Sequence, residues 1–225
     1  MKIIEEKDMD NIKTDLGKSE YLLKYLSIDE SLNGRFKTYK KDTKILIVGT
    51  ITPEDGKFYY CNPNAKHNTL DFLFEYFKSE KKSFFVNQKY YQIKDFRKAV
   101  ADKEQSAIEE IKNALATHKI AFLDVIRRAL RVKDSAIDSN LIYATLDYES
   151  FEEPLNNNEL FIIVNSLEAK RCFEEIFKRV KHQTIKVKEF SHNSEDKYVK
   201  ISQISRKQKL DELYKLWESA LSKKL

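Results

Sequence analysis

Four short runs rich in apolar residues constrain the fold of this chain more than any other feature. They occupy residues 45–48, 118–125, 160–165 and 184–187. A short apolar run bounded by turn residues or helix caps is typical of a strand buried on both faces. Segments with helical periodicity separate the runs, and this alternation predicts parallel strands covered by helices. The sequence therefore predicts an α/β protein with three layers, α/β/α, around a central four-stranded parallel sheet.

The predicted helices have apolar residues at intervals of three and four. Ser166 is the expected N-cap of the third helix, and Asn68 or Thr69 of the first. Residues 4–26 alternate charged and apolar positions, which indicates one or two amphipathic helices lying over the fold. The helices between and after the strands are expected at residues 70–77, 104–117, 167–179 and 206–221.

We expect residues 1–225 to form a single domain, because a chain of this length can bury one sizeable core. It holds four Gly and three Pro, and no stretch has the composition of a flexible linker. Residues 1–40 are expected to form an N-terminal helical extension and residues 44–221 the core. The extension could gate a site, bind a partner or only cover the sheet.

The charge of the chain permits nucleic acid as a partner without demanding it. The net charge is +5, and residues 156–225 hold 15 Lys and Arg against 10 Asp and Glu. A basic segment can lie along a phosphate backbone and give salt-dependent binding. A solvated surface rich in lysine explains the same pattern.

Cysteine and histidine usage argues against two other classes of protein. Cys61 and Cys172 are the only cysteines and four His are scattered, so spacing supports neither a disulfide framework nor a zinc finger. No cofactor is expected. No run approaches the roughly 18 apolar residues of a membrane span, and the acidic N-terminal residues do not suit a secretory signal. We expect an intracellular, cytoplasmic protein.

The ends of the predicted strands define a candidate pocket. In open α/β sheets, ligands bind outside the carboxyl ends of the strands. Those ends are the loop after Gly49, Asp124 with the residues behind it, Asn165–Ser166, and the loop 189–197.

The residues at these ends resemble motifs of a known family. Residues 45–50, followed by Tyr59-Tyr60, Asn62-Pro63 and Asn68, are similar to the first motif region of hypoxanthine-DNA glycosylases. In that family a strand ends in Gly-Ser, and Tyr-Tyr, His-Pro and Asn-aromatic elements follow.

Further segments resemble the same family in the same order. Residues 120–125, continuing through Arg127 and Arg131 to residues 135–141, are similar to a strand ending in Asp-Val, an Arg-containing turn and a Ser-x-x-Asp-x-x-Ile stretch. Asp147-Tyr148 with Phe151 resembles an Asn-Asp-Phe element, and residues 161–170 resemble a strand-turn-helix reading Phe-Asn-Gly-x-x-Ala. The resemblance covers about residues 44–221.

The resemblance implies the uracil-DNA glycosylase superfamily and hydrolysis of the N-glycosidic bond of a base flipped out of DNA, with uracil or hypoxanthine the first candidates. The implied partner is DNA, bound by a monomer. Two motifs depart from the family. Residues 49–53 offer only hydroxyls where many relatives carry Asp, Asn or Glu, and residues 190–194 lack the proline of the final motif.

Carried onto this chain, the resemblance assigns roles to individual residues. Asn68, and next Asn64, would position the attacking water and read the base edge, whereas Asn68 as a helix cap is the structural alternative. His192 would donate a hydrogen bond to the departing base, and Tyr60 or Phe58 would stack on it. Ser191 or Asn193 would hold a phosphate or fill the gap left in the duplex. The other expected substrate-binding residues are Gly49, Thr50, Thr52, Asp124 and Asn165. The expected DNA-backbone contacts are Ser166 and, because basic residues cluster around the last motif region, Lys197, Lys200 and Arg206.

Two other functions stay open at this stage. The missing carboxylate and proline also suit a catalytically inactive superfamily member that binds DNA or a modified base. A small-molecule hydrolase or nucleotide-binding protein is less favoured, because no Gly-x-Gly-x-x-Gly or P-loop element follows any strand.

Overall fold

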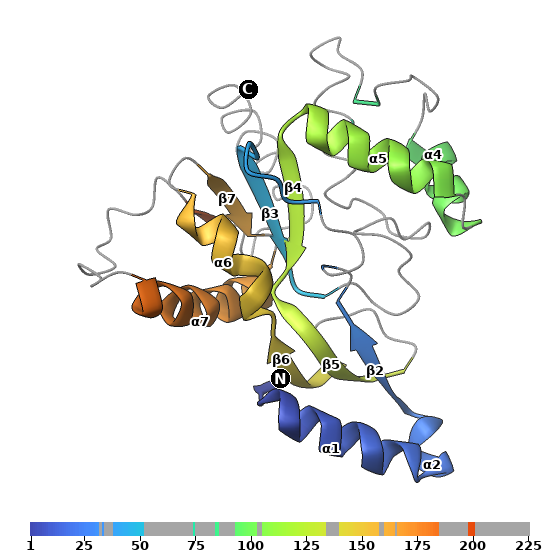
Figure 1. Ribbon diagram of the computed structural model, residues 1–225. Coiled ribbons are helices and arrows are strands. Elements are labelled where there is room, and N and C mark those ends of the chain that lie inside the picture. Colours follow the sequence, from blue (N-terminus) through green and yellow to red (C-terminus); the bar gives the residue numbers. More distant parts are fainter. Residues whose placement is uncertain are drawn as a thin grey trace.

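The computed structural model shows an α/β protein with two four-stranded sheets, which confirms the predicted class (Figure 1). The residues it describes are 1–31, 33, 38–51, 74, 84–85, 93–102, 105–133, 140–157, 160–164, 166–184 and 198–200.

The first sheet, sheet B, is parallel at each neighbouring pair of strands. Its strands run in the order β4-β3-β7-β8, and β3 is buried along its whole length. Aliphatic side chains on both faces of a strand require cover on both faces, as the sequence predicts. The strands are β3 (Ile45–Gly49), β4 (Ile120–Asp124), β7 (Phe161–Val164) and β8 (Tyr198–Lys200).

The second sheet, sheet A, was not predicted. Its order is β1-β6-β5-β2, with β1 parallel to β6 and the other two pairs antiparallel. The chain runs from β4 into β5 with only Val125 between them, so one extended segment belongs to both sheets (Figure 1). The strands are β1 (Lys2–Ile3), β2 (Leu26–Glu30), β5 (Ile126–Val132) and β6 (Leu141–Leu146).

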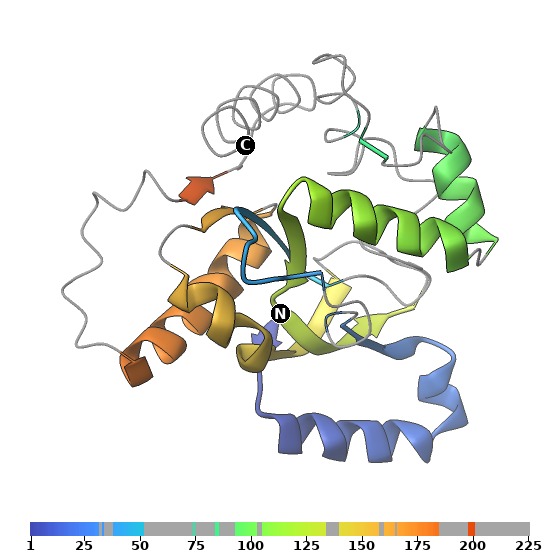
Figure 2. The same cartoon turned by 45° about the horizontal axis from the view of Figure 1, so that its top comes forward.

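Helices lie on opposite sides of sheet B. Helix α5 contacts β4 on one side, whereas α7 contacts β3 and β7 on the other side and packs against α6 (Figures 1 and 2). Helix α1 lies along sheet A and contacts β6. The helices are α1 (Glu6–Gly17), α2 (Glu20–Leu23), α4 (Ile93–Ala101), α5 (Gln105–Thr117), α6 (Tyr148–Asn156) and α7 (Leu167–Thr184).

Two side chains cover the outer edge of β4. The Thr38 hydroxyl accepts a hydrogen bond from Phe122 N at 2.8 Å and donates to Phe122 O at 2.8 Å. Asn33 does the same for Asp124, accepting from its N–H at 2.8 Å and donating to its carbonyl at 2.7 Å. An edge strand exposes backbone groups that invite pairing with another chain. Thr38 and Asn33 satisfy these groups at alternate residues in place of a fifth strand.

Most predicted elements of sheet B are confirmed. The runs at residues 45–48, 118–125 and 160–165 contain β3, β4 and β7, and the helices expected at 104–117 and 167–179 correspond to α5 and α7. The fourth predicted strand, 184–187, is wrong at its start. Thr184 still belongs to α7, because apolar residues at helical spacing continue through Val180 and are buried. Residues 185–187 lie outside the described residues, and β8 takes the fourth place in sheet B.

The N-terminal residues differ from the expected helical extension. Helix α1, which buries Met9 and Leu16, confirms an amphipathic helix within residues 4–26, whereas the short α2 buries none of its residues. The strands β1 and β2 flank these helices and pair with β6 and β5. The extension therefore contributes two strands to sheet A. The Arg-containing turn expected after Asp124 is also a strand, β5, because the segment is hydrogen-bonded on both edges to β2 and β6.

Two predicted helices lie wholly or mostly outside the described residues. The helix expected at 206–221 lies outside the described residues, and so does the helix at 70–77 except Phe74, which is helical.

Candidate functional site

The carboxyl ends of β3 and β4 lie side by side. Gly49 is in register with Asp124, and Val125 N donates to Gly49 O at 2.9 Å. One residue further, Ile126 N donates to Thr50 O at 3.0 Å. These two hydrogen bonds lie beyond the last paired residues, and they hold the backbone of Gly49 and Thr50 on the β4 side.

Thr50 also reaches across to the end of β7. Its hydroxyl lies 2.9 Å from the Ser166 hydroxyl, and either oxygen can donate. Ser166 Oγ accepts a hydrogen bond from Ala169 N at 3.0 Å, so Ser166 caps α7 as predicted. A helix N-terminus has N–H groups without intrahelical partners and a partial positive charge, which favour anionic or carbonyl oxygens. The Thr50–Ser166 pair thus joins the first loop to the start of α7.

The strand order makes this edge a topological switch point. The inner strands β3 and β7 are neighbours in sheet B. The strand that follows β3 in sequence, β4, lies on the far side of β3 from β7, and the strand that follows β7, β8, lies on the far side of β7 from β3. The connections that leave β3 and β7 therefore diverge. In open α/β sheets, ligands bind outside the carboxyl ends of the strands at such a point. Thr50 and Ser166 follow those two strands directly.

Asp124 is buried beside this edge, with 1% of its surface exposed. Asn33 holds its backbone, and the same amide nitrogen of Asn33 donates to Asp147 Oδ2 at 2.8 Å. Asp147 in turn caps α6, accepting hydrogen bonds from Ser150 N at 3.3 Å and Ser150 Oγ at 2.7 Å. Asn33 therefore connects the end of sheet B to the start of α6.

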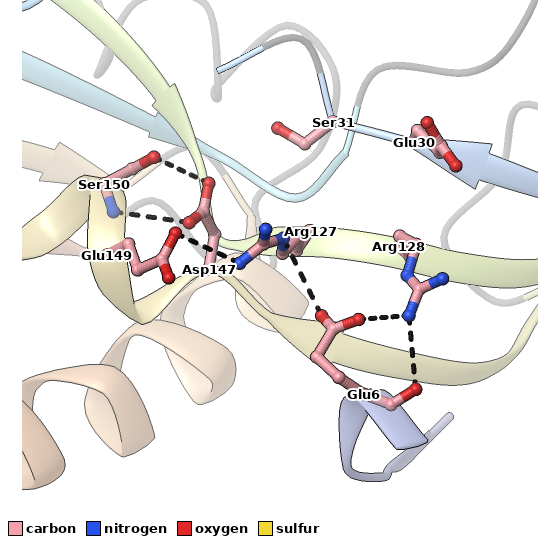
Figure 3. A pocket seen from close by; sticks show the side chains of 8 residues that line it. All are labelled: Glu6, Glu30, Ser31, Arg127, Arg128, Asp147, Glu149 and Ser150. Atoms are coloured by element: carbon pink, nitrogen blue, oxygen red, sulfur yellow. Dashed lines mark hydrogen bonds and ion pairs between the residues drawn. The ribbon is translucent and has the colours of Figure 1, made fainter. Parts of the chain in front are cut away.

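A polar cavity of about 390 Å³ opens next to Asp147, where α1, β2, β5 and α6 meet (Figure 3). Four carboxylates and two guanidinium groups face it. An incoming anion would have to displace a carboxylate from one of the arginines, so the cavity is poorly suited to phosphate. The lining residues are Glu6, Glu30, Ser31, Arg127, Arg128, Asp147, Glu149 and Ser150.

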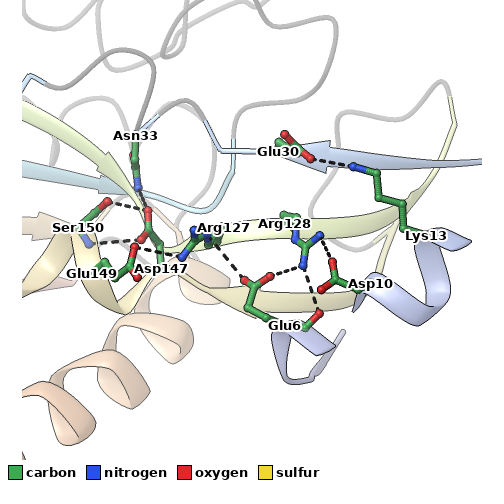
Figure 4. A network of polar contacts seen from close by, with 10 residues as sticks. All are labelled: Glu6, Asp10, Lys13, Glu30, Asn33, Arg127, Arg128, Asp147, Glu149 and Ser150. Atoms are coloured by element: carbon green, nitrogen blue, oxygen red, sulfur yellow. Dashed lines mark hydrogen bonds and ion pairs between the residues drawn. The ribbon is translucent and has the colours of Figure 1, made fainter. Parts of the chain in front are cut away.

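Ion pairs across this cavity hold α1 against sheet A (Figure 4). Arg128 donates to Glu6 and, at 2.7 Å, to Asp10 Oδ1. Arg127 lies 3.2 Å from Glu149 Oε2 and 3.9 Å from Glu6 Oε1. Partial burial alone would lower the pKa of Arg128, but its hydrogen bonds to Asp10 and Glu6 outweigh that effect, and the pKa is raised. Arg128 therefore stays charged.

The structure brings together four of the residues predicted for the site. Gly49, Thr50, Asp124 and Ser166 lie at the carboxyl edge of sheet B. Lys200 lies in β8, whose side chains are not described. The remaining predicted residues lie outside the described residues: Thr52, Phe58, Tyr60, Asn64, Asn68, Asn165, Ser191, His192, Asn193, Lys197 and Arg206.

Sequence reasoning missed Asn33 and Asp147 as parts of this edge. Asn33-Gly34 has the composition of a turn, and nothing local indicates that the Asn side chain pairs with a strand 91 residues away. Asp147 precedes a helix and carries a capping signal, which places it at a helix start but not beside Asn33.

Comparison with protein-family models, with curated proteins and with solved structures finds no match to this chain. Within the described ranges, no helix is long and apolar enough to cross a membrane. The same part of the chain contains no group of three or more His, Cys, Asp or Glu side chains that could hold a metal ion.

Proposed function

We propose that this protein binds DNA and hydrolyses the N-glycosidic bond of a deaminated or modified base, uracil or hypoxanthine first, that is flipped out of the helix. The base would lie outside the carboxyl ends of β3 and β7. The resemblance of the motifs to the uracil-DNA glycosylase superfamily provides the reaction, and the switch point provides a place for it.

The observation that carries the proposal is the contact between Thr50 and Ser166 at 2.9 Å. Thr50 and Ser166 belong to two different family-like motifs and are 116 residues apart in sequence, yet their hydroxyls lie within hydrogen-bond distance at the switch point. Gly49 is buried, and its carbonyl accepts a hydrogen bond from Val125 N, so the backbone that leads into Thr50 is held in place.

The proposal also includes the detailed architecture of the fold. We infer a three-layer arrangement of the uracil-DNA glycosylase type, with sheet B as its central parallel sheet. The placement of α5 on one side of sheet B and of α6 and α7 on the other supports it (Figure 2). Sheet A is an addition at the carboxyl end of sheet B.

DNA would approach away from the polar cavity. Phosphates near Glu30 and Glu149 would meet carboxylates that are 62% and 78% exposed. Repulsion of this kind disfavours a backbone path across the cavity. The basic residues expected to follow the backbone, Lys197, Lys200 and Arg206, belong instead to the segment that contains β8.

A second candidate function is binding without hydrolysis. Asp124 is in register with Gly49 of the first motif, and it is buried, with 1% of its surface exposed, so it is poorly placed to activate a solvent water. The Thr50 hydroxyl is engaged with Ser166. Both observations favour a protein that holds DNA or a modified base without a general base of its own at these positions.

The test is incubation with labelled single- and double-stranded oligonucleotides that each carry one uracil, hypoxanthine, xanthine or 5-hydroxymethyluracil, followed by alkali and a denaturing gel. Glycosylase activity predicts strand breaks at one lesion for the wild type and none for Asn68→Ala. A matched variant, Asn11→Ala on the exposed surface of α1, is expected to cleave like the wild type.

Each result decides between the candidates. DNA retained in a native gel without strand breaks at any lesion favours the binding protein. If the protein neither cleaves nor retains any of the oligonucleotides at low salt, both functions are contradicted.

A further inference from the structure

Exposed apolar and aromatic side chains gather at one end of sheet A. Five of the six large apolar side chains that are exposed among the described residues belong to this aromatic patch. Tyr21 and Tyr25 are 68% and 54% exposed, and the other three are between 39% and 41% exposed. The patch consists of Tyr21, Leu22, Leu23, Tyr25 and Val132.

Three elements build the aromatic patch. Helix α2 supplies its first three residues, Tyr25 precedes β2, and Val132 ends β5 opposite Leu26. Lys133 N donates to Tyr25 O at 2.8 Å and closes the ladder there. The backbone under the patch is therefore ordered by sheet pairing. A group of exposed apolar side chains on such a frame is typical of an interaction surface.

The rim of the aromatic patch is basic. Lys133 Nζ donates to the Leu23 carbonyl, which places its ammonium group beside the patch. Neither Lys24 nor Lys133 has an ion pair with any carboxylate that the structure describes. Lys18 is paired with Asp15 at 3.1 Å, and Glu20 is the only acid within residues 18–25. Lys24 and Lys133 thus leave positive charge next to the two tyrosines.

We propose that the aromatic patch binds a single strand of nucleic acid. Bases would stack on Tyr21 and Tyr25, whose ring centroids lie 5.2 Å apart at 59° and so present two differently oriented faces. Lys24 and Lys133 would contact the phosphates. Aromatic platforms flanked by lysines bind single strands without sequence preference, because every base has a face to stack.

The charge favours nucleic acid over a second copy of the chain. In a twofold contact the same patch would face itself, and Lys24 and Lys133 of each copy would approach their equivalents. A polyanion removes that repulsion and releases counterions from its phosphates.

The choice of DNA as the polyanion rests on the proposed function. The aromatic patch would then contact the DNA strand at a second place, outside the proposed base site.

The test is fluorescence anisotropy with a labelled single strand of about 15 nucleotides, as DNA and as RNA, with the matching duplex in parallel. The double variant Tyr21→Ala/Tyr25→Ala is expected to weaken single-strand binding about tenfold or more. Tyr21→Phe/Tyr25→Phe keeps the rings and is expected to bind like the wild type.

Lysine variants test the rim separately. Lys24→Gln/Lys133→Gln is expected to reduce the slope of log affinity against log salt by about 1.4, roughly 0.7 for each phosphate contact on a single strand. Lys112→Gln on α5, which changes the net charge by one unit elsewhere, is the control. Circular dichroism melting of every variant establishes that the fold is intact.

Unchanged single-strand affinity in the folded alanine variant overturns the inference. The inference is also overturned if the alanine variant changes the sedimentation of the protein but not its affinity for the single strand, because the patch is then an interface between copies of the protein. The experiments distinguish failure of the proposed glycosylase function from failure of this inference. Tyrosine-dependent binding without base excision keeps this inference and contradicts the glycosylase, whereas excision with binding that ignores both tyrosines contradicts this inference alone.

Discussion

Sheet B and sheet A have four strands each, but different forces hold them. In sheet B the inner strand β3 is wholly buried between β4 and β7, and the residues that pair with it are apolar except Asp124. In sheet A charged side chains lie inside the protein, and the ion pair of Asp29 with Arg131 is almost completely buried. Burial of aliphatic surface is favourable without any particular partner, whereas a buried charge depends on one specific partner.

Because of this contrast, the two sheets tolerate different kinds of amino-acid substitution. An aliphatic strand of sheet B tolerates another apolar residue of similar volume. A charged position of sheet A tolerates change only together with its partner. The two sheets meet at β4 and β5, with Asn33 bridging from the end of β4 to Asp147, so disturbance of sheet A can reach the proposed site through one side chain.

The largest expected effect comes from breaking the buried pair of sheet A. Arg131→Met leaves Asp29 charged and buried, and we expect it to lower the free energy of unfolding by about 3 to 5 kcal/mol. Urea unfolding followed by circular dichroism measures it. The double variant Asp29→Leu/Arg131→Met removes both charges and is expected to recover most of the loss. Equal losses in the single and double variants would contradict the view that an unpaired charge causes the effect.

A smaller effect is expected at the connection between the sheets. Asn33→Ala removes the three side-chain hydrogen bonds described above, two of them to the buried backbone of Asp124 and one to Asp147. We expect a loss of about 2 kcal/mol in the free energy of unfolding. Hydrogen exchange should show the amide of Asp124 losing protection. Exposed Asn11→Ala is the control, and protection of Asp124 equal to the wild type would show that Asn33 does not hold this edge.

The same contrast explains what the sequence predicts. Residues 45–49 are apolar up to Gly49, and such a run identifies a buried strand without knowledge of its neighbours. The segment Ile126–Val132 reads Ile-Arg-Arg-Ala-Leu-Arg-Val, and three arginines do not fit the pattern of a half-buried strand. Arg128 is neutralised by Glu6 and Asp10, and Arg131 by Asp29, all about 100 residues away in sequence. No local pattern contains these partners.

At the candidate site, too, features that depend on the local sequence could be predicted, and features that depend on distant residues could not. Gly49, Thr50, Asp124 and Ser166 could be predicted because they end strands or cap a helix, and strand ends of a parallel sheet meet at one edge. The burial of Asp124 could not be predicted, because it depends on Asn33 and on the second sheet beside it.

The central claim is that the base lies at the switch point of sheet B and not in the polar cavity beside sheet A. The most direct measurement is an NMR titration of the ¹⁵N-labelled protein with free uracil, hypoxanthine and a lesion-containing single strand. The account predicts that the amide signals of Gly49, Thr50 and Ser166 shift with one of these ligands in a saturable way. Shifts confined to Glu30, Ser31, Glu149 and Ser150 would place the ligand in the cavity and contradict it.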